Sequence, residues 1–291
     1  MQDLHYFPGH MKKTQRAIAE NIKKMDAVCE VLDARIPISS RNPDIDDLTA
    51  GRPRLIVLNH TDQADEKRTK QWAAYFRGLG WAVMETSAKS GSGVKQFAPA
   101  VRSLLAEKIK AYEEKGQAGR TIRVMVVGIP NVGKSTFINK VSGRKTAKAE
   151  DRPGVTRSNQ WVPVDSRLEL LDTPGILWPK FEDQKAAERL AFIGAIRDEV
   201  VDVEELASAL IEFLAKDYPE CLKERYKIEP EDGKNGYDLL SMAGRKRGFL
   251  MSGGEVNTER MANILLDEFR AGKLGRFTLE TPEDIENGIK K

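Results

Sequence analysis

The sequence predicts an α/β domain with a mostly parallel sheet and helices on both faces, followed by a small all-helical domain. Short apolar runs alternate with amphipathic stretches over residues 1–178, which is typical of buried strands connected by helices. After about residue 179 the strand signal fades, and apolar residues recur at helical spacing. We therefore expect domains at 1–178 and 201–291, joined by a linker at 179–200.

The elements follow from hydrophobic period and from capping residues. Strands are expected at 26–33, 54–59, 81–86, 121–127, 160–164 and 168–171. In the first domain, helices are expected at 12–25, 65–78, 93–116 and 134–141, with a Pro- and Ser-containing loop at 36–44. In the second domain, they are expected near 203–214, 236–243 and 261–269, the last one capped by Asn257 or Thr258 and stopped by Gly272.

Composition excludes several classes of protein. The 291 residues are 40% hydrophobic and 31% charged, as in folded globular chains and unlike disordered ones. Apolar runs such as 124–127 are too short to cross a bilayer, and the N-terminus has no signal-peptide pattern. The two cysteines, Cys29 and Cys221, make neither a disulfide framework nor a metal motif. We expect a cytoplasmic protein without a membrane partner.

The net charge of +3 conceals an asymmetry. Residues 1–178 carry a net charge of +9 and the remainder carries −6. The first part is therefore attractive to polyanions, although a solvated basic surface has the same composition.

The sharpest motif is GIPNVGKS at 128–135, which matches the phosphate-binding P-loop pattern G-x-x-x-x-G-K-[ST]. An apolar strand precedes it and a helix follows it, as the motif requires. The glycines let backbone N–H groups surround phosphate oxygens at a helix N-terminus. Lys134 is then expected to reach the β- and γ-phosphates, and the Ser135 hydroxyl to ligate Mg²⁺.

Four shorter segments are similar to the other motifs of GTPases. Residues 172–175 (DTPG) resemble the D-x-x-G element, in which Asp172 would help hold Mg²⁺ and the Gly175 N–H would sense the γ-phosphate. Thr156 resembles the switch threonine that closes over Mg²⁺. Residues 59–62 (NHTD) resemble N-K-x-D, and residues 87–89 resemble the S-A-K base-binding loop.

Guanine specificity is expected from Asp62, whose carboxylate can accept both N1–H and N2–H of the base. His60 stands where Lys is usual, and its imidazole can stack on the base instead. The complete set of expected nucleotide-binding residues is Asn59, His60, Asp62, Ser87, Ala88, Lys89, Asn131, Val132, Gly133, Lys134, Ser135, Thr136 and Gly175.

The order of these motifs is unusual, because the base-reading segments precede the P-loop. The chain therefore resembles the circularly permuted GTPases, with a circularly permuted P-loop GTPase domain at 1–178. Within that group, the segments FPGHM at 7–11 and LDARIP at 32–37, the P-loop and the stretch 265–279 resemble the ribosome biogenesis GTPase A family. The helical domain would follow the D-x-x-G switch directly, so loss of the γ-phosphate could reposition it.

The catalytic groups are less obvious. In many GTPases a Gln after D-x-x-G orients the attacking water, but this position is Ile176. The resemblance suggests His10, in the F-P-G-H segment, as the water-positioning group, alongside Lys134 and Thr156. In related GTPases an Asn at the place of Asn131 helps to coordinate K⁺, so the resemblance implies Mg²⁺ and K⁺ as cofactors.

The resemblance implies GTP and GDP as ligands, and rRNA and proteins of a large ribosomal subunit precursor as partners. Candidate RNA-contacting residues are Arg245, Lys246, Arg247, Lys273 and Arg276. The expected function is a GTP-hydrolysing switch in late large-subunit assembly, acting as a monomer off the ribosome. The alternatives are a GTP-gated RNA-binding module with negligible turnover, a GTPase acting on another RNA, a tRNA-modification GTPase and an ATP-using P-loop enzyme.

Overall fold

The computed structural model describes residues 8–144, 160–175, 177, 184–231 and 233–286, with the backbone alone for 8–14 and 286. Six strands form one sheet: β1 (Ala27–Asp33), β2 (Arg54–Asn59), β3 (Ala82–Glu85), β4 (Ile122–Val127), β5 (Gln160–Asp165) and β6 (Leu168–Asp172). Their order is β3-β2-β1-β4-β6-β5, and only β5 runs antiparallel to its neighbour. The expected mostly parallel sheet is confirmed.

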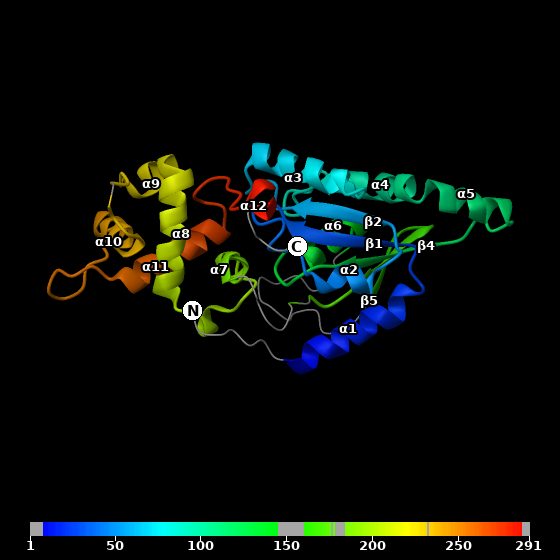
Figure 1. Cartoon of the computed structure of the whole chain (residues 1–291), viewed down its shortest axis with the longest axis horizontal. Coiled ribbons are helices and arrows are strands. Elements are labelled where there is room, and N and C mark those ends of the chain that lie inside the picture. Colours follow the sequence, from blue (N-terminus) through cyan, green and yellow to red (C-terminus); the bar gives the residue numbers. More distant parts are fainter. Residues whose placement is uncertain (1–7, 145–159, 176, 178–183, 232, 287–291) are drawn as a thin grey trace.

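Helices cover both faces of this sheet, as expected (Figure 1). Both faces need cover because successive apolar side chains of β1 point to opposite faces. Cys29 and Val31 belong to one hydrophobic cluster, whereas Val28 and Leu32 belong to clusters of the opposite face. The helices of this region are α1 (Pro8–Ile22), α2 (Asp44–Leu48), α3 (Glu66–Gly78), α4 (Phe97–Leu104), α5 (Ala106–Glu114) and α6 (Lys134–Ser142). The helices α4 and α6 meet on the first face, where Phe97 and Phe137 contact edge to face.

A helical region follows, as predicted, and lies at one end of the molecule (Figure 1). It contains α7 (Gln184–Phe192), η2 (Asp198–Val200), α8 (Val203–Asp217), α9 (Pro219–Tyr226), α10 (Gly236–Lys246) and α11 (Thr258–Arg270). The short α12 (Glu283–Glu286) lies instead beside α3 (Figure 1), and its Ile285 packs against the hydrophobic cluster that contains Trp72 and Phe76. The Asn257 side chain caps α11 by accepting from the Arg260 N–H, and Asn235 forms a capping box on α10. The apolar faces of α8, α10 and α11 share one hydrophobic cluster with the sheet, so the two cores are continuous.

The helix predicted at 93–116 is confirmed in its helical character but not in its continuity, because the chain there forms three pieces: η1 (Val94–Gln96), α4 and α5. Gly93 is left-handed, and a Cβ on it would lie 2.1 Å from the Glu85 carbonyl oxygen. Leu105 turns into the core at 2% exposure with φ −106° and ψ 16°, which interrupts the helix. Beyond it, no residue of α5 is fully buried, and this helix contacts the core through the partly buried Ile109 and Tyr112, whose hydroxyl donates to Asp26 at 2.8 Å.

Three further local expectations differ from the structure. The first helix begins earlier and ends at Ile22, because Met25 packs into the core under β1 instead of continuing the helix. At the end of the expected 36–44 loop, α2 begins, with buried Ile45. The 179–200 stretch contains α7, and α9 starts at Pro219, the favoured first position of a helix.

The C-terminal segment returns to the GTPase-like region. Residues 274–280, which we name the C-terminal strap, run from α11 to the side of α3 (Figure 1). The Leu279 N–H donates to the Arg35 carbonyl, and the Trp72 indole N–H donates to the Glu280 carbonyl. The Glu280 carboxylate is 1% exposed and accepts from Ser39 and Arg189.

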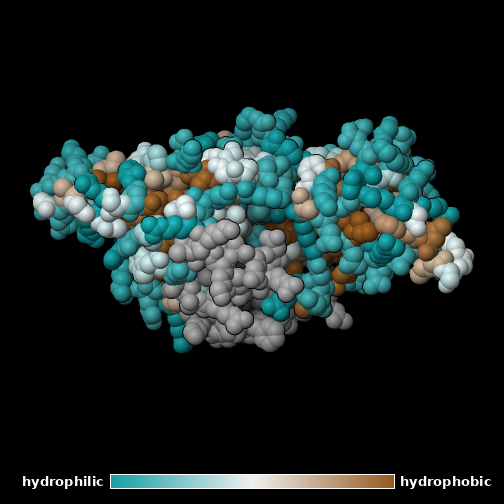
Figure 2. All heavy atoms as spheres, turned by 180° about the vertical axis from the view of Figure 1, so that it is seen from behind, coloured by the Kyte–Doolittle hydropathy of each residue, from teal (hydrophilic) through white to brown (hydrophobic). Residues whose placement is uncertain are grey.

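The surface is mostly hydrophilic. On the face seen in Figure 2, polar side chains cover most of the described surface, and hydrophobic ones appear in separate patches. None of the helices in the described ranges has the length and apolar composition needed to cross a membrane.

Glu280 gives a direct test of the strap. Removing one partner of a buried ion pair costs about 3–5 kcal/mol, because the remaining charge stays buried without compensation. We expect Glu280→Ala to lower the free energy of unfolding by about that amount in urea denaturation. The exposed Glu283 in α12 provides the control, and Glu283→Ala should change stability by less than about 0.5 kcal/mol. A loss below about 1 kcal/mol for Glu280→Ala would show that the strap is not held by this carboxylate.

Candidate nucleotide-binding site

The carboxyl ends of the parallel strands bring the predicted motifs together. The P-loop leaves β4 and enters α6 at Lys134, and the 59–62 segment leaves β2. The 86–89 segment follows β3, and β6 ends on Asp172. Asn59 is in register with Asp33 of β1, the strand that separates β2 from β4. Ligands of open α/β sheets bind at this edge, so the topology supports the expected site.

Asn59 holds three of these segments with one buried amide. Its Nδ2 donates to the Val132 carbonyl of the P-loop at 2.9 Å. Its Oδ1 accepts from the Ala88 N–H at 2.9 Å and from the Thr86 hydroxyl at 3.2 Å. Because the side chain is 1% exposed, these bonds are shielded from competition with water. The expected base-reading loops are thus tied directly to the P-loop.

The P-loop conformation depends on its glycines. Gly128 has φ +148°, and a Cβ on it would lie 2.5 Å from the Val31 carbonyl oxygen. Gly133 has φ +84°, and a Cβ there would lie 2.3 Å from Asn59 Nδ2 and 3.1 Å from His60 Nε2. Side chains at these positions would push apart the strands and loops that surround the phosphate cradle.

Lys134 and Asp172 form a buried pair of opposite charge at the bottom of the site. Lys134 is 7% exposed and donates to the Ile129 carbonyl at 2.6 Å. Burial lowers the pKa of Lys134 to about 8, although the nearby Asp172 opposes the shift. Burial likewise raises the pKa of Asp172 to about 6, opposed by Lys134. A phosphate oxygen beside Lys134 would compensate the cost of burying the ammonium group.

The residues present fit a magnesium ion. Asp172 Oδ1 is buried and has no hydrogen-bond partner within the described part of the chain. A buried carboxylate oxygen of this kind is a hard ligand that a cation, or water on a cation, would satisfy. Ser135 follows Lys134 at the start of α6 and is partly exposed. These two residues are therefore the ones that would hold Mg²⁺; the third expected ligand, Thr156, lies outside the described residues.

Gly175 lies against the P-loop. A Cβ on it would be 2.7 Å from the Pro130 nitrogen and 3.0 Å from Lys134 Nζ. The D-x-x-G glycine is therefore next to the ammonium group expected to contact the γ-phosphate. Residue Ile176, which occupies the position of the water-orienting Gln, lies outside the described residues.

Asn131 contacts the helical region. Its Nδ2 donates to the Gly194 carbonyl at 2.5 Å, just beyond the end of α7. This bond does not use the amide oxygen, which is the atom that would coordinate K⁺. The potassium role of Asn131 stays a prediction.

The other predicted residues are placed as follows. Ser87, Ala88 and Val132 are buried, Ser135, Thr136 and His60 are partly exposed, and Asp62 and Lys89 are exposed. His10 belongs to α1, but its side chain lies outside the described part of the structure. Asp62 therefore lies at the surface of the loop, accessible to a ligand.

Sequence reasoning missed residues that support the base-reading loop. Arg35 is 4% exposed, bonds Asp33 through two nitrogens and donates to Gln63 Oε1 at 2.9 Å. Its guanidinium also lies 5.8 Å from the centre of the Phe269 ring in α11. Arg35 lies in the 32–37 segment that carried the family resemblance, but no sequence period indicates that α11 and Gln63 meet it.

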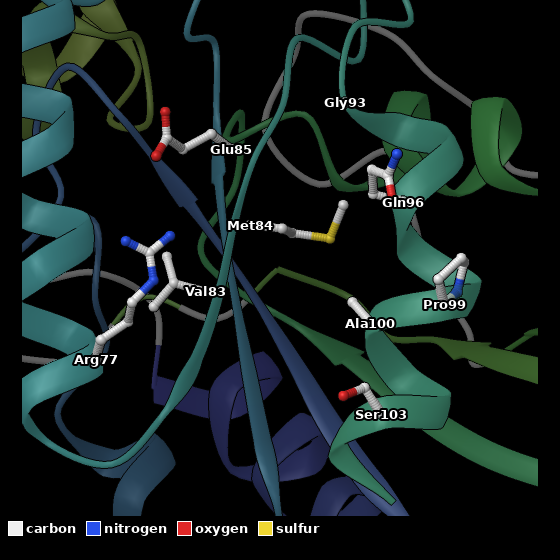
Figure 3. Close-up of a pocket in the computed structure, with 9 residues that line it drawn as sticks. All are labelled: Arg77, Val83, Met84, Glu85, Gly93, Gln96, Pro99, Ala100 and Ser103. Atoms are coloured by element: carbon white, nitrogen blue, oxygen red, sulfur yellow. The ribbon is translucent and has the colours of Figure 1, made fainter. Parts of the chain in front are cut away.

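A separate pocket of about 460 Å³ lies at the outer edge of the sheet, between α3, β3 and α4 (Figure 3). It is lined by Arg77, Val83, Met84, Glu85, Gly93, Gln96, Pro99, Ala100 and Ser103. None of these residues belongs to the P-loop or to the base-reading segments, so the pocket is distinct from the nucleotide site.

The shifted pKa of Lys134 predicts a pH dependence for nucleotide binding. Phosphate binds the protonated amine and raises its pKa, so affinity should be constant well below pH 8 and fall as pH rises through about 8. The limiting slope is about tenfold per pH unit for one proton. Titration with a fluorescent GDP analogue in EDTA between pH 6.5 and 9, below the range in which guanine N1–H ionises, measures it. Lys134→Met should bind weakly with no such fall, and an equal fall in that variant would assign the titration to another group.

Comparison with known proteins agrees with this geometry. A family model described as "50S ribosome-binding GTPase" matches residues 123–229. Ribosome biogenesis GTPase A of Bacillus cereus is 48% identical over 289 residues, covering 99% of this chain and 97% of that protein. The protein of the same name from Thermotoga maritima is 31% identical, covering 97% and 96%.

Solved structures match over the same length. The crystal structure of GNP-bound YlqF from T. maritima has a TM-score of 0.65 and 28% identity, covering 93% of this chain and 99% of that one. The GDP-bound structure of YlqF has a TM-score of 0.66 and 29% identity, covering 92% and 100%. Fold, motif geometry and near-complete alignment agree, and this chain belongs to the ribosome biogenesis GTPase A family and is a GTPase.

Proposed function

We propose that this GTPase is a switch in late assembly of the large ribosomal subunit, bound to the precursor in its GTP state and released after hydrolysis. The observation that carries the proposal is the 2.5 Å bond from Asn131 of the P-loop to the Gly194 carbonyl. Arg270 of α11 donates to the Phe192 carbonyl at 3.0 Å and makes two 2.7 Å bonds to Asp198. The segment 192–198 therefore contacts the P-loop through Gly194 and contacts α11 of the helical region through Phe192 and Asp198.

The same contact explains how phosphate could be sensed at a distance. Gly175 lies beside Lys134, and α7 begins only nine residues later at Gln184. Gly175 precedes α7 in the chain, and Asn131 bonds Gly194 just after α7. A γ-phosphate that displaces Gly175 or Asn131 would therefore act on the two ends of α7. The helical region then has a different preferred position with GTP than with GDP, which is what a switch requires.

Hydrolysis in the proposed mechanism uses residues from distant segments. Lys134 contacts the β- and γ-phosphates, and Asp62 holds the guanine. Ile176 cannot orient water, so His10 takes this role when the N-terminal segment reaches the site. Mg²⁺, held through Ser135, Thr156 and Asp172, would neutralise charge on the phosphates. The Asn131 amide oxygen would contribute to a K⁺ site that replaces an arginine finger.

The proposed partner is the precursor of the large ribosomal subunit. The family description names 50S ribosome binding, and the relatives are named for ribosome biogenesis. In the helical region, Arg245, Lys246 and Lys273 are exposed and suited to contact phosphates. Arg247 is instead paired with Glu268, and Arg276 donates to backbone carbonyls, so these two are less available to RNA.

A second candidate function is a GTP-gated RNA-binding module with negligible turnover of its own. Ile176 in the position of the catalytic Gln favours it for the protein in isolation. Turnover in the presence of the particle separates the two candidates.

The switch predicts turnover that depends on both the particle and the cation. GTP hydrolysis should rise at least tenfold with purified large subunits in K⁺ and much less in Na⁺, because the subunit completes the site and K⁺ replaces the arginine finger. His10→Ala should lose most of the stimulation while retaining GDP affinity. Phosphate release under these conditions is the measurement.

His5→Ala is the matched control for that experiment and should behave as the native protein does. Stimulation that survives in His10→Ala would remove His10 from the mechanism. Turnover unaffected by subunits would favour the GTP-gated binder.

The basic residues of α10 predict salt-dependent binding to the particle. The double variant Arg245→Ala, Lys246→Ala should weaken binding at all salt concentrations and reduce the slope of log K against log salt by about 1–2, since two phosphate contacts are lost. Sedimentation with large-subunit particles at several KCl concentrations measures both. The double variant Arg197→Ala, Lys216→Ala removes the same charge from exposed positions elsewhere. Equal slopes for the two double variants would contradict a local contact.

A further inference from the structure

The C-terminal strap binds the loop that contains Asp62. The Phe277 N–H donates to the Gln63 carbonyl at 2.8 Å. Arg276 Nε donates to the Ala64 carbonyl at 2.9 Å, and its Nη2 donates to the Thr61 carbonyl at 2.8 Å. Three backbone carbonyls on the two sides of Asp62 therefore accept hydrogen bonds from two consecutive strap residues.

Other contacts hold this loop as well: the Gln63 N–H donates to the His60 carbonyl at 2.9 Å, and the Asp65 N–H donates to Thr278 Oγ1 of the strap at 3.2 Å. On its inner side the Thr61 N–H donates to the Thr86 carbonyl at 3.1 Å, and Arg35 holds the Gln63 side chain. Gly272 packs so closely that a Cβ on it would lie 2.8 Å from Gln63 Cγ. Asp62 itself is exposed, so the position of its carboxylate follows from the backbone that these groups hold.

Guanine recognition makes this backbone position important. A carboxylate that accepts N1–H and N2–H together must lie within about 0.5 Å of the productive position. An arginine fork suits this task, because its donors are fixed in one plane and lose little freedom when they bind. A lysine at the same place would carry the same charge, but its ammonium group would not donate hydrogen bonds in two fixed directions.

We propose that Arg276 is a positioning residue for guanine selectivity: its guanidinium clamps the Thr61 and Ala64 carbonyls so that Asp62 meets both N–H groups of the base. The proposal rests on the proposed reading of guanine by Asp62. It also gives the helical region an influence on base recognition, because only residues 271–273 separate α11 from the strap. Phosphate contact with RNA is the other role for this arginine, and the experiment separates the two.

The test compares binding of GDP with binding of IDP, the inosine analogue that lacks the 2-amino group. For Arg276→Ala we expect GDP affinity to fall about tenfold and IDP affinity about threefold or less, so the GDP-to-IDP ratio falls at least about threefold. A partly unfolded variant weakens both nucleotides by the same factor, so the ratio does not report mere loss of structure. Arg197→Ala removes an equal charge from an exposed position and should leave both affinities unchanged.

Arg276→Lys tests the fork itself and serves if the alanine variant does not fold. Lysine keeps the positive charge but cannot donate to the Thr61 and Ala64 carbonyls in the two fixed directions of the guanidinium. The GDP-to-IDP affinity ratio of this variant should therefore also fall below the native value. Equal weakening of GDP and IDP in both variants overturns the proposal. Loss of binding to ribosomal particles with an unchanged ratio also overturns it and assigns Arg276 to RNA.

Asp62→Asn separates failure of this proposal from failure of the guanine-reading site. Its amide donates where the carboxylate accepts, so preference should move from GDP toward XDP, whose base has an oxygen at position 2. If Asp62→Asn keeps the native GDP-to-IDP ratio, Asp62 does not read guanine and the proposed site is wrong. If the GDP-to-IDP affinity ratio falls in Asp62→Asn but stays at the native value in the Arg276 variants, only the role of Arg276 is overturned.

Discussion

The buried amide of Asn59 is the interaction on which the site depends. It joins the P-loop to the 86–88 segment through three hydrogen bonds, and its own backbone begins the loop that contains Asp62. The joined segments leave the carboxyl ends of β2, β3 and β4, so their proximity is a property of the sheet and not of their order in the chain. A permuted sequence can therefore build a nucleotide site from motifs in an unusual order.

The sheet and its motifs could be predicted from the sequence, because short apolar strands and the P-loop are local signals. The order of the strands could not, since it depends on pairing between distant segments such as β1 and β4. The break at Leu105 was also missed, because one buried leucine fits a continuous helical period as well as an interrupted one. The site was predicted where motifs are local, as at Asn59 and Lys134, whereas the supporting residues Arg35, Arg276 and Glu280 become neighbours only in the fold.

Charge was the weakest guide to the helical region. Its basic residues suggest RNA contact by composition, but Arg247 and Arg270 pair with the carboxylates of Glu268 and Asp198, and Arg276 caps carbonyls beside Asp62. The helical region is accordingly joined to the nucleotide site at two places: Asn131 meets Gly194, and the C-terminal strap meets the base-reading loop. Two contacts with different parts of the nucleotide site allow both ends of a bound nucleotide to influence the same helices.

If the protein is the proposed switch, its nucleotide state and its affinity for the particle are coupled. The most direct test is the dissociation constant for large-subunit precursor particles with GDP and with a non-hydrolysable GTP analogue. We expect binding about 5–150-fold tighter with the analogue, and by reciprocity an equal gain in analogue affinity on the particle relative to GDP. Equal particle affinities in the two nucleotide states would rule out the proposed switch, because a particle that binds both states equally cannot shift the protein from one state to the other.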